Sequence, residues 1–139
     1  MNTRILILCT GNSARSQLAE GLLRSMGGGK LDVFSAGTKP NFVRPEAIAV
    51  MAERGIDISG QTSKHVDEFK GQSFDYVITV CDNAREACPI FPGAPRRIHW
   101  SLPDPAAVKG SEERLEAFRN VRAMLTVRFG EFLRELARA

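Results

Sequence analysis

One short stretch constrains this chain more than any other, and it reads Cys9-Thr10-Gly11-Asn12-Ser13-Ala14-Arg15-Ser16. Residues 4–8 before it form an apolar run typical of a buried strand, and residues 17–24 after it repeat apolar side chains at helical spacing. At a strand-to-helix loop, backbone amides and the positive end of the helix dipole attract an anion. The thiol of Cys9 and the guanidinium of Arg15 complete a cup for a tetrahedral oxyanion, and the same field favours thiolate at Cys9.

The residue types within the loop fit that purpose. Gly11 and Asn12 accept unusual backbone angles, and two serines supply hydroxyl donors. The alternative is that Cys9 is a small buried hydrophobe and Arg15 a surface charge, which explains neither the loop nor the arginine. The residues expected to bind the oxyanion are Thr10, Gly11, Asn12, Ser13, Ala14, Arg15 and Ser16.

The length, the charge and the number of cysteines limit the class of protein to which this chain can belong. The 139 residues fit a single domain, residues 1–139. The net charge of +3 comes from 19 basic and 16 acidic residues mixed along the chain, so nucleic acid is not an expected partner. No apolar stretch reaches about 18 residues, so we expect neither a membrane span nor a signal peptide. Three cysteines favour thiol chemistry over a structural disulfide, and we expect a monomeric, cytoplasmic protein.

Strand-like and helical segments alternate along the chain. Strands are predicted at residues 4–8, 31–36, 75–80 and 96–100. Helices are predicted at 17–24, at 46–54 after Pro45, from a cap at Ser63 through Phe69, and in a long final segment that begins at Ser111. This alternation predicts an α/β fold with a four-stranded parallel sheet, helices on both faces and a site at the carboxyl ends of the strands.

The three cysteines are related by that fold. Cys9 and Cys81 follow the first and third strands, so both are expected at the same edge of the sheet. Cys88 is seven residues after Cys81, too far for a C-x-x-C pair. A disulfide between them requires the intervening segment to loop or unwind, because the two Cα atoms must come within about 7 Å. The alternative, a zinc site of these two cysteines and His99, lacks a fourth ligand and close ligand spacing.

The sequence as a whole resembles the thioredoxin-coupled arsenate reductases that have the low-molecular-weight protein tyrosine phosphatase fold. The resemblance covers nearly the entire chain. Besides the loop with Gln17, the motifs that match in order and spacing are Ser35-Ala36-Gly37, Thr62-Ser63, Val80-Cys81-Asp82, Ala87-Cys88-Pro89 and His99-Trp100 leading into Asp104-Pro105-Ala106. The pair Cys81 and Cys88, and Gln17 where the phosphatases commonly have proline, favour the reductase branch.

The resemblance implies how arsenate would bind and react. The loop amides and the planar fork of Arg15 hold the oxyanion. Cys9 attacks arsenic, Asp104 protonates the leaving oxygen, and Ser16 donates a hydrogen bond to the Cys9 sulfur.

The resemblance also implies a relay of disulfides. Cys81 attacks Cys9, arsenite leaves, and Cys88 then attacks Cys81 and frees Cys9. Residues 82–87 would act as the shuttle. Thioredoxin would supply the electrons, and no cofactor is expected to stay bound.

Two other classes of function remain open from the residues. A phosphotyrosine phosphatase would use Cys9, Arg15 and Asp104 with water resolving the adduct, and weak phosphatase activity is expected even of a reductase. A non-enzymatic redox sensor would use Cys81 and Cys88 without Arg15 or Asp104. The alternative for Asp104, which stands between two prolines, is a turn residue.

Some members of the family bind potassium through side chains that match Asn12, Glu20 and Ser35 and an acidic residue that here is Lys64. A lysine ammonium in that place would pair with Glu20, so we expect no bound metal and no dependence on potassium. The alternative is a solvated Lys64. Asn12 is expected to shape the loop, and His99 to pack near the site.

Overall fold

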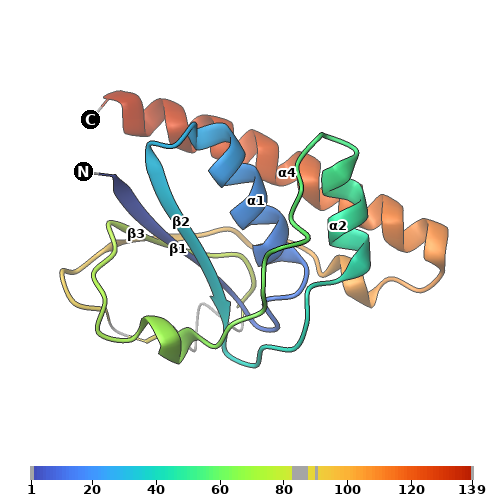
Figure 1. Ribbon diagram of the computed structural model, residues 1–139, viewed down its shortest axis with the longest axis horizontal. Helices are drawn as coiled ribbons and strands as arrows, with labels where there is room; N and C mark the ends of the chain where they lie inside the picture. Colours follow the sequence, from blue (N-terminus) through green and yellow to red (C-terminus); the bar gives the residue numbers. More distant parts are fainter. Residues whose placement is uncertain (1, 83–87, 90, 139) are drawn as a thin grey trace.

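Four short strands and the helices between them follow the predicted alternation. The computed structural model describes residues 2–82, 88–89 and 91–138. Its elements, shown in Figure 1, are β1 (Thr3–Cys9), α1 (Arg15–Gly27), β2 (Leu31–Gly37), α2 (Pro45–Ala52), the 3₁₀ helix η1 (Val66–Phe69), β3 (Tyr76–Thr79), β4 (Arg96–His99), the 3₁₀ turn η2 (Pro105–Ala107) and α4 (Ser111–Arg138).

The strands form one parallel sheet in the order β2-β1-β3-β4, which confirms the predicted sheet. β1 pairs on both sides, and its residues from Ile5 to Leu8 are fully buried. A continuous apolar run of this kind is typical of a parallel strand covered on both faces. The chain leaves β1 toward β2 on one side and later returns to β3 on the other, so the carboxyl end of β1 is the switch point where ligands bind in open α/β sheets.

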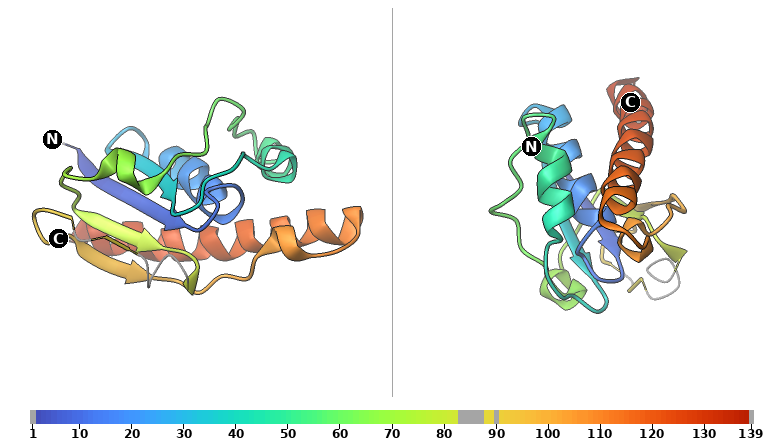
Figure 2. Two further views of the ribbon diagram at one scale, coloured as in Figure 1. Left: turned by 90° about the horizontal axis from the view of Figure 1, so that it is seen from below. Right: turned by 90° about the vertical axis from the view of Figure 1, so that its right-hand side faces the viewer.

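Helices cover both faces of the sheet. The three α-helices α1, α2 and α4 contact one another on one face, where Trp100 packs on Phe129 of α4 with ring centroids 5.3 Å apart. The 3₁₀ helix η1 covers part of the other face, where Phe69 packs against Phe34 of β2 at 5.6 Å (Figure 2). The predicted two-sided cover is therefore present, although the long helices gather on one side.

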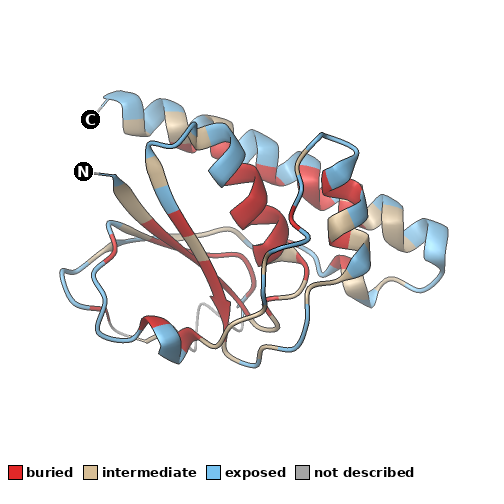
Figure 3. Cartoon of the chain, viewed as in Figure 1, coloured by how far each residue is buried: buried red, intermediate tan, exposed pale blue. Residues whose placement is uncertain are grey.

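Burial is concentrated where α1 meets the sheet. The residues from Ser16 to Leu23 are all buried, whereas α4 keeps an exposed face along its length (Figure 3). Within the described parts of the chain, none of the helices combines the length and the apolar character that a membrane crossing requires. The buried first turns of α1 hold the loop that precedes them against the core.

Several predicted boundaries differ from the observed ones, among them the end of the helix predicted at residues 46–54, which is at Ala52. Ser63 does not cap a helix, because its hydroxyl donates to Gly11 O at 3.0 Å, and His65 Nδ1 caps η1 instead by accepting from Asp67 N at 3.0 Å. β3 ends at Thr79, so the observed strand is shorter at its carboxyl end than the predicted one. Residues 83–87, predicted to shuttle the disulfide, lie outside the described residues.

Candidate active site

Residues 10–16, which are predicted to bind an oxyanion, form a loop. Several of its carbonyl oxygens accept hydrogen bonds from residues outside the loop. We call residues 9–16 the anion loop. Backbone amides of residues 39–44 donate to the carbonyl oxygens of Thr10, Gly11 and Ser13 at 2.9, 3.2 and 2.9 Å. Because a trans peptide directs its C=O and N–H to opposite sides, this bonding of the carbonyls favours amides that face the interior of the loop. Binding of an anion by such amides stays a prediction.

Asn12 holds the loop in this shape. Its backbone φ is 47°, in the left-handed region that asparagine tolerates better than most residues. Its buried Nδ2 donates to Ser16 Oγ at 2.8 Å and to Ser35 Oγ at 2.9 Å, while its Oδ1 accepts from Lys64 N at 2.8 Å. These three bonds join the loop to α1, β2 and the segment before η1, which agrees with the structural role predicted for Asn12.

Gly37, at the end of β2, makes room for the loop. The register of the sheet places it beside Cys9. A Cβ atom at this position would clash with the carbonyl oxygen of Thr10 and lie 2.9 Å from Asn12 N. The absence of a side chain at Gly37 is therefore what lets the loop close against the sheet.

Gln17 serves the same loop from the helix side. Its Nε2 donates to Asn12 O at 2.9 Å and to Thr62 O at 3.0 Å, and its Oε1 accepts from Gln61 Nε2 at 2.7 Å. The residue that distinguishes this chain from the phosphatase pattern thus carries a buried hydrogen-bond network that proline lacks the atoms to make.

Arg15 begins α1 at the rim of the cup. Its Nη1 donates to Leu102 O at 3.0 Å. Its Nε is buried and has no hydrogen-bond partner among the residues that the structure describes. Leaving a buried guanidinium donor unpaired is costly, and an oxyanion in the loop would satisfy it.

Asp104 lies on the segment that Arg15 contacts through Leu102. It follows Leu102 by two residues, its side chain is exposed, and its Oδ1 accepts from Ala106 N at 3.0 Å, which caps η2. The turn role expected as the alternative is thus present. The role of Asp104 as an acid stays a prediction.

The thiols of Cys9 and Cys81 meet at the carboxyl edge of the sheet, as predicted. Both residues are buried, and the side chain of Cys81 is the largest influence on the pKa of Cys9, so the two thiols lie next to each other. Thr10 Oγ1 lies 3.2 Å from Cys81 Sγ, so the loop contacts both sulfurs. All three cysteines carry thiols in this structure.

The protonation of Cys9 differs from the prediction. The hydrogen bond to Cys81 and burial raise the pKa of the Cys9 thiol well above its ordinary value, whereas the charge of Arg15 and a hydrogen bond from the Thr10 amide lower it. The raising causes are larger. The loop therefore acts on Cys9 in the predicted direction, through Arg15 and the Thr10 amide, but the second thiol and burial outweigh it in this arrangement.

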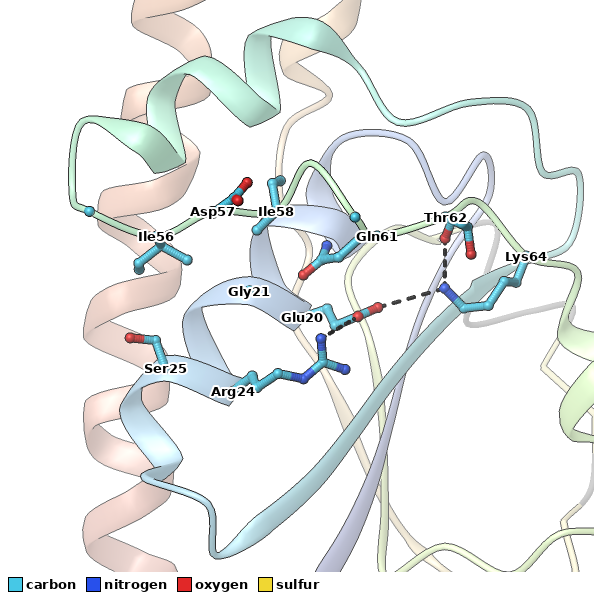
Figure 4. Close-up of a pocket in the computed structure, with 12 residues that line it drawn as sticks. Glu20, Gly21, Arg24, Ser25, Ile56, Asp57, Ile58, Gln61, Thr62 and Lys64 are labelled. Carbon is cyan, nitrogen blue, oxygen red and sulfur yellow. Dashed lines mark hydrogen bonds and ion pairs between the residues drawn. The ribbon is translucent and has the colours of Figure 1, made fainter.

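Lys64 and Glu20 form an ion pair behind the loop, as the sequence predicts. Lys64 Nζ lies 3.8 Å from Glu20 Oε1 and donates to Thr62 O at 2.6 Å (Figure 4). Glu20 also pairs with Arg24 at 2.9 Å and accepts from Ser35 Oγ at 2.5 Å. These groups line one side of a cavity of about 580 Å³. Because two cationic side chains already surround this carboxylate, the residues present do not fit an additional cation.

Cys88 contacts β4 through a residue that the sequence did not single out. Arg97 Nη1 lies 2.8 Å from Cys88 Sγ. His99, predicted to pack, instead makes two polar contacts, 2.7 Å from its Nδ1 to Thr79 Oγ1 and 2.9 Å from its Nε2 to Asp82 Oδ1. These partners of His99 are not cysteines, which removes the geometric basis of the zinc alternative. The alternation of Arg97 and His99 along one strand is the signal that could have indicated their shared face from the sequence.

The fold and the loop define an α/β protein with a buried cysteine at the start of a strand-to-helix loop. The family model for low molecular weight phosphotyrosine protein phosphatase matches residues 4–139, and the chain belongs to this family.

The similar proteins have names that are more specific than the name of the family. An arsenate reductase of Halalkalibacterium halodurans is 43% identical over 134 residues, which cover 95% of this chain and 96% of that protein. A solved structure of an arsenate reductase in the phosphate-binding state has 36% identity and a TM-score of 0.77, covering 96% of this chain and 98% of the other. A thioredoxin-dependent arsenate reductase of Corynebacterium glutamicum has 26% identity and a TM-score of 0.76, covering 98% of this chain and 62% of that one.

Proposed function

We propose that this protein reduces arsenate to arsenite through Cys9, Cys81 and Cys88, and that thioredoxin regenerates it. The observation that carries the proposal is a second buried cysteine at the anion loop: Cys81, whose sulfur lies 3.2 Å from Oγ1 of Thr10, the residue next to Cys9. A phosphatase needs one thiol there, whereas a reductase needs a second sulfur within reach of the first. The name shared by the relatives and the thioredoxin-dependent neighbour support the same reaction.

Arsenate enters the cup of loop amides, and the unpaired Nε donor of Arg15 supports binding of its oxygens. Breaking the hydrogen bond to Cys81 removes the largest cause that raises the pKa of Cys9, and the charge of Arg15 then favours the thiolate. The thiolate forms a sulfur–arsenic bond as one arsenic–oxygen bond breaks. Asp104 supplies a proton, so that this oxygen leaves as water.

The electrons then move from sulfur to arsenic. The Cys81 thiolate attacks the Cys9 sulfur, a disulfide forms, and the electron pair of the sulfur–arsenic bond stays on arsenic, which leaves as arsenite. Cys88 next attacks Cys81, and Cys9 departs as a thiolate. Cys81 is buried and Cys88 only partly so, which supports transfer of the disulfide to a position that a reductant can reach.

The test is arsenate-dependent oxidation of NADPH in the presence of thioredoxin and its reductase. The wild-type protein is expected to turn over repeatedly, while Cys88→Ser stops after one round with the Cys9–Cys81 disulfide formed. Sustained turnover by Cys88→Ser would refute the relay.

Phosphatase activity is the second candidate, favoured by the family to which the chain belongs and by a loop that suits phosphate. Hydrolysis of an aryl phosphate, measured in parallel, separates the two. Brisk hydrolysis without arsenate-dependent oxidation, and with Cys88→Ser neutral, would assign the protein to the phosphatases.

We also propose that the reaction needs no bound metal and that the Lys64 ammonium neutralises Glu20 behind the loop, as supported by their 3.8 Å separation. The monomeric state and the cytoplasmic location stay predictions.

A further inference from the structure

Strand β4 presents two polar side chains to the residues on either side of the segment 83–87. Arg97 and His99 alternate along the strand, so they lie on the same face of the sheet, whereas Trp100 packs on α4 at the other face. His99 Nε2 lies 2.9 Å from Asp82 Oδ1, one residue after Cys81. Arg97 Nη1 lies 2.8 Å from the sulfur of Cys88 itself.

The contact from Arg97 is a two-point contact. While Nη1 donates to Cys88 Sγ, Nη2 donates to Pro89 O at 2.9 Å. Guanidinium donors are held in one plane, so two donors engaged with adjacent residues set the direction of the thiol as well as its position. Arg97 is exposed, and the contact therefore forms without the cost of burying its charge.

A cavity lies beside the thiol. Its volume is about 270 Å³, and besides Cys88 it is lined by Val77 and Thr79 of β3 and by three residues of β4, which are Arg97, Ile98 and His99. Thr79 is the last residue of β3 and stands two positions before Cys81. The cavity thus adjoins the strand that leads to the other sulfur of the pair.

We propose that Arg97 is a positioning residue that holds the Cys88 thiol for its attack on Cys81, while His99 holds the Cys81 end through Asp82. The proposal rests on the proposed function. In that step Cys88 gives its proton to water, its sulfur bonds to Cys81 Sγ, and the bond between Cys81 and Cys9 breaks. Cys9 leaves with the electron pair and takes up a proton, so one disulfide replaces another without net oxidation. Arg97 releases the sulfur as it reacts, because a disulfide sulfur is only a weak acceptor.

The experiment compares Arg97→Gln and Arg97→Lys with the matched control Arg96→Gln, which changes the neighbouring arginine of the same strand. Two quantities are measured for each protein: arsenite released in a single turnover without reductant, and kcat with saturating thioredoxin. The single-turnover yield and rate are expected to stay at wild-type values in all variants. We expect kcat to fall about tenfold in Arg97→Gln, because a charge-assisted hydrogen bond is lost. In Arg97→Lys kcat should be partly restored, and in Arg96→Gln it should be unchanged.

Two results would overturn the role of Arg97. One is a kcat for Arg97→Gln equal to that of Arg96→Gln. The other is a single-turnover rate that falls by the same factor as kcat, because the residue would then act through the whole fold. If the wild-type protein releases no arsenite in a single turnover, the proposed function itself fails, which is a distinct outcome.

A second measurement tests the contact without the relay. The guanidinium should make Cys88 of the reduced protein react faster with anionic iodoacetate, relative to neutral iodoacetamide, than it does in Arg97→Gln. The modified cysteine is identified by peptide mass. An equal ratio in the two proteins would contradict the contact between Arg97 and Cys88.

Discussion

The anion loop and the surroundings of Cys88 are held in opposite ways. Hydrogen bonds reach the loop from α1, from β2 and from residues 39–44, and Asn12 and Gln17 are both fully buried. Among the described residues, Cys88 is contacted from the sheet by Arg97, an exposed arginine of the edge strand. Stabilising a charge on an oxyanion requires donors that are already in place, whereas passing a disulfide requires a sulfur that can leave its contacts. The two regions match these two demands.

Cys81 stands between the two regions. It is buried with Cys9 and touches Thr10, yet the next residue, Asp82, is exposed and held by His99. The second sulfur of the proposed relay thus lies where the rigid loop meets the part of the site that depends on β4.

The largest effect is expected from Arg15→Lys in the rigid region. An ammonium lacks the planar fork and places a single point charge at the rim, so kcat/KM for arsenate should fall about a hundredfold or more. Steady-state kinetics with thioredoxin measures this, and the melting temperature serves as the control for folding. Near wild-type activity would mean that the unpaired guanidinium donor is not used.

Gly37→Ala tests how closely the loop is packed against β2. The added methyl group would clash with the carbonyl oxygen of Thr10, which is backbone, so the free energy of unfolding should fall by about 2 kcal/mol and activity should fall with it. Denaturation with urea measures the loss. Gly60→Ala is the matched control, since no atom lies within 4 Å of a Cβ there, and its expected change is within about 0.5 kcal/mol. Equal losses in the two variants would show that the loop yields to the methyl group.

Cys81→Ala should lower the pKa of the Cys9 thiol. The side chain of Cys81 is the largest cause that raises this pKa, and Arg15 and the Thr10 amide, which lower it, remain in the variant. Cys9 should consequently react with iodoacetamide at lower pH than in the wild type. The pH dependence of alkylation measures the shift, with Cys88→Ala as the control that leaves it in place. A higher pKa in Cys81→Ala would contradict the assigned cause.

The smallest effect is expected from potassium. Because Lys64 and Arg24 already face Glu20, replacing sodium by potassium at equal ionic strength should change neither activity nor the melting temperature. A rise in melting temperature with potassium that sodium does not reproduce would overturn this prediction.

Local pattern was enough to predict the order of the strands and helices, because burial imposes a period of two or of about 3.6 on each segment separately. It misplaced the cap before η1, since Ser63 and His65 are both able to cap and the choice depended on Gly11, which is distant in sequence. The role of Asp104 as an acid was predicted from the family resemblance, and the thiolate of Cys9 was predicted from the field of a strand-to-helix loop. In the structure Asp104 also caps η2, and the pKa of the Cys9 thiol is raised.

The residues from Cys9 to Ser16, with a strand before and a helix after, were enough to predict an oxyanion-binding loop and the parallel sheet that carries it, since such a loop has few other uses. Only the folded chain decided what surrounds that cup. The amides of residues 39–44 that turn its carbonyls outward, the thiol of Cys81 that keeps Cys9 protonated, and the arginine of β4 that holds Cys88 all come from elsewhere in the sequence. Hydrogen bonds and desolvation depend on which segments meet in space, and no local pattern encodes that meeting.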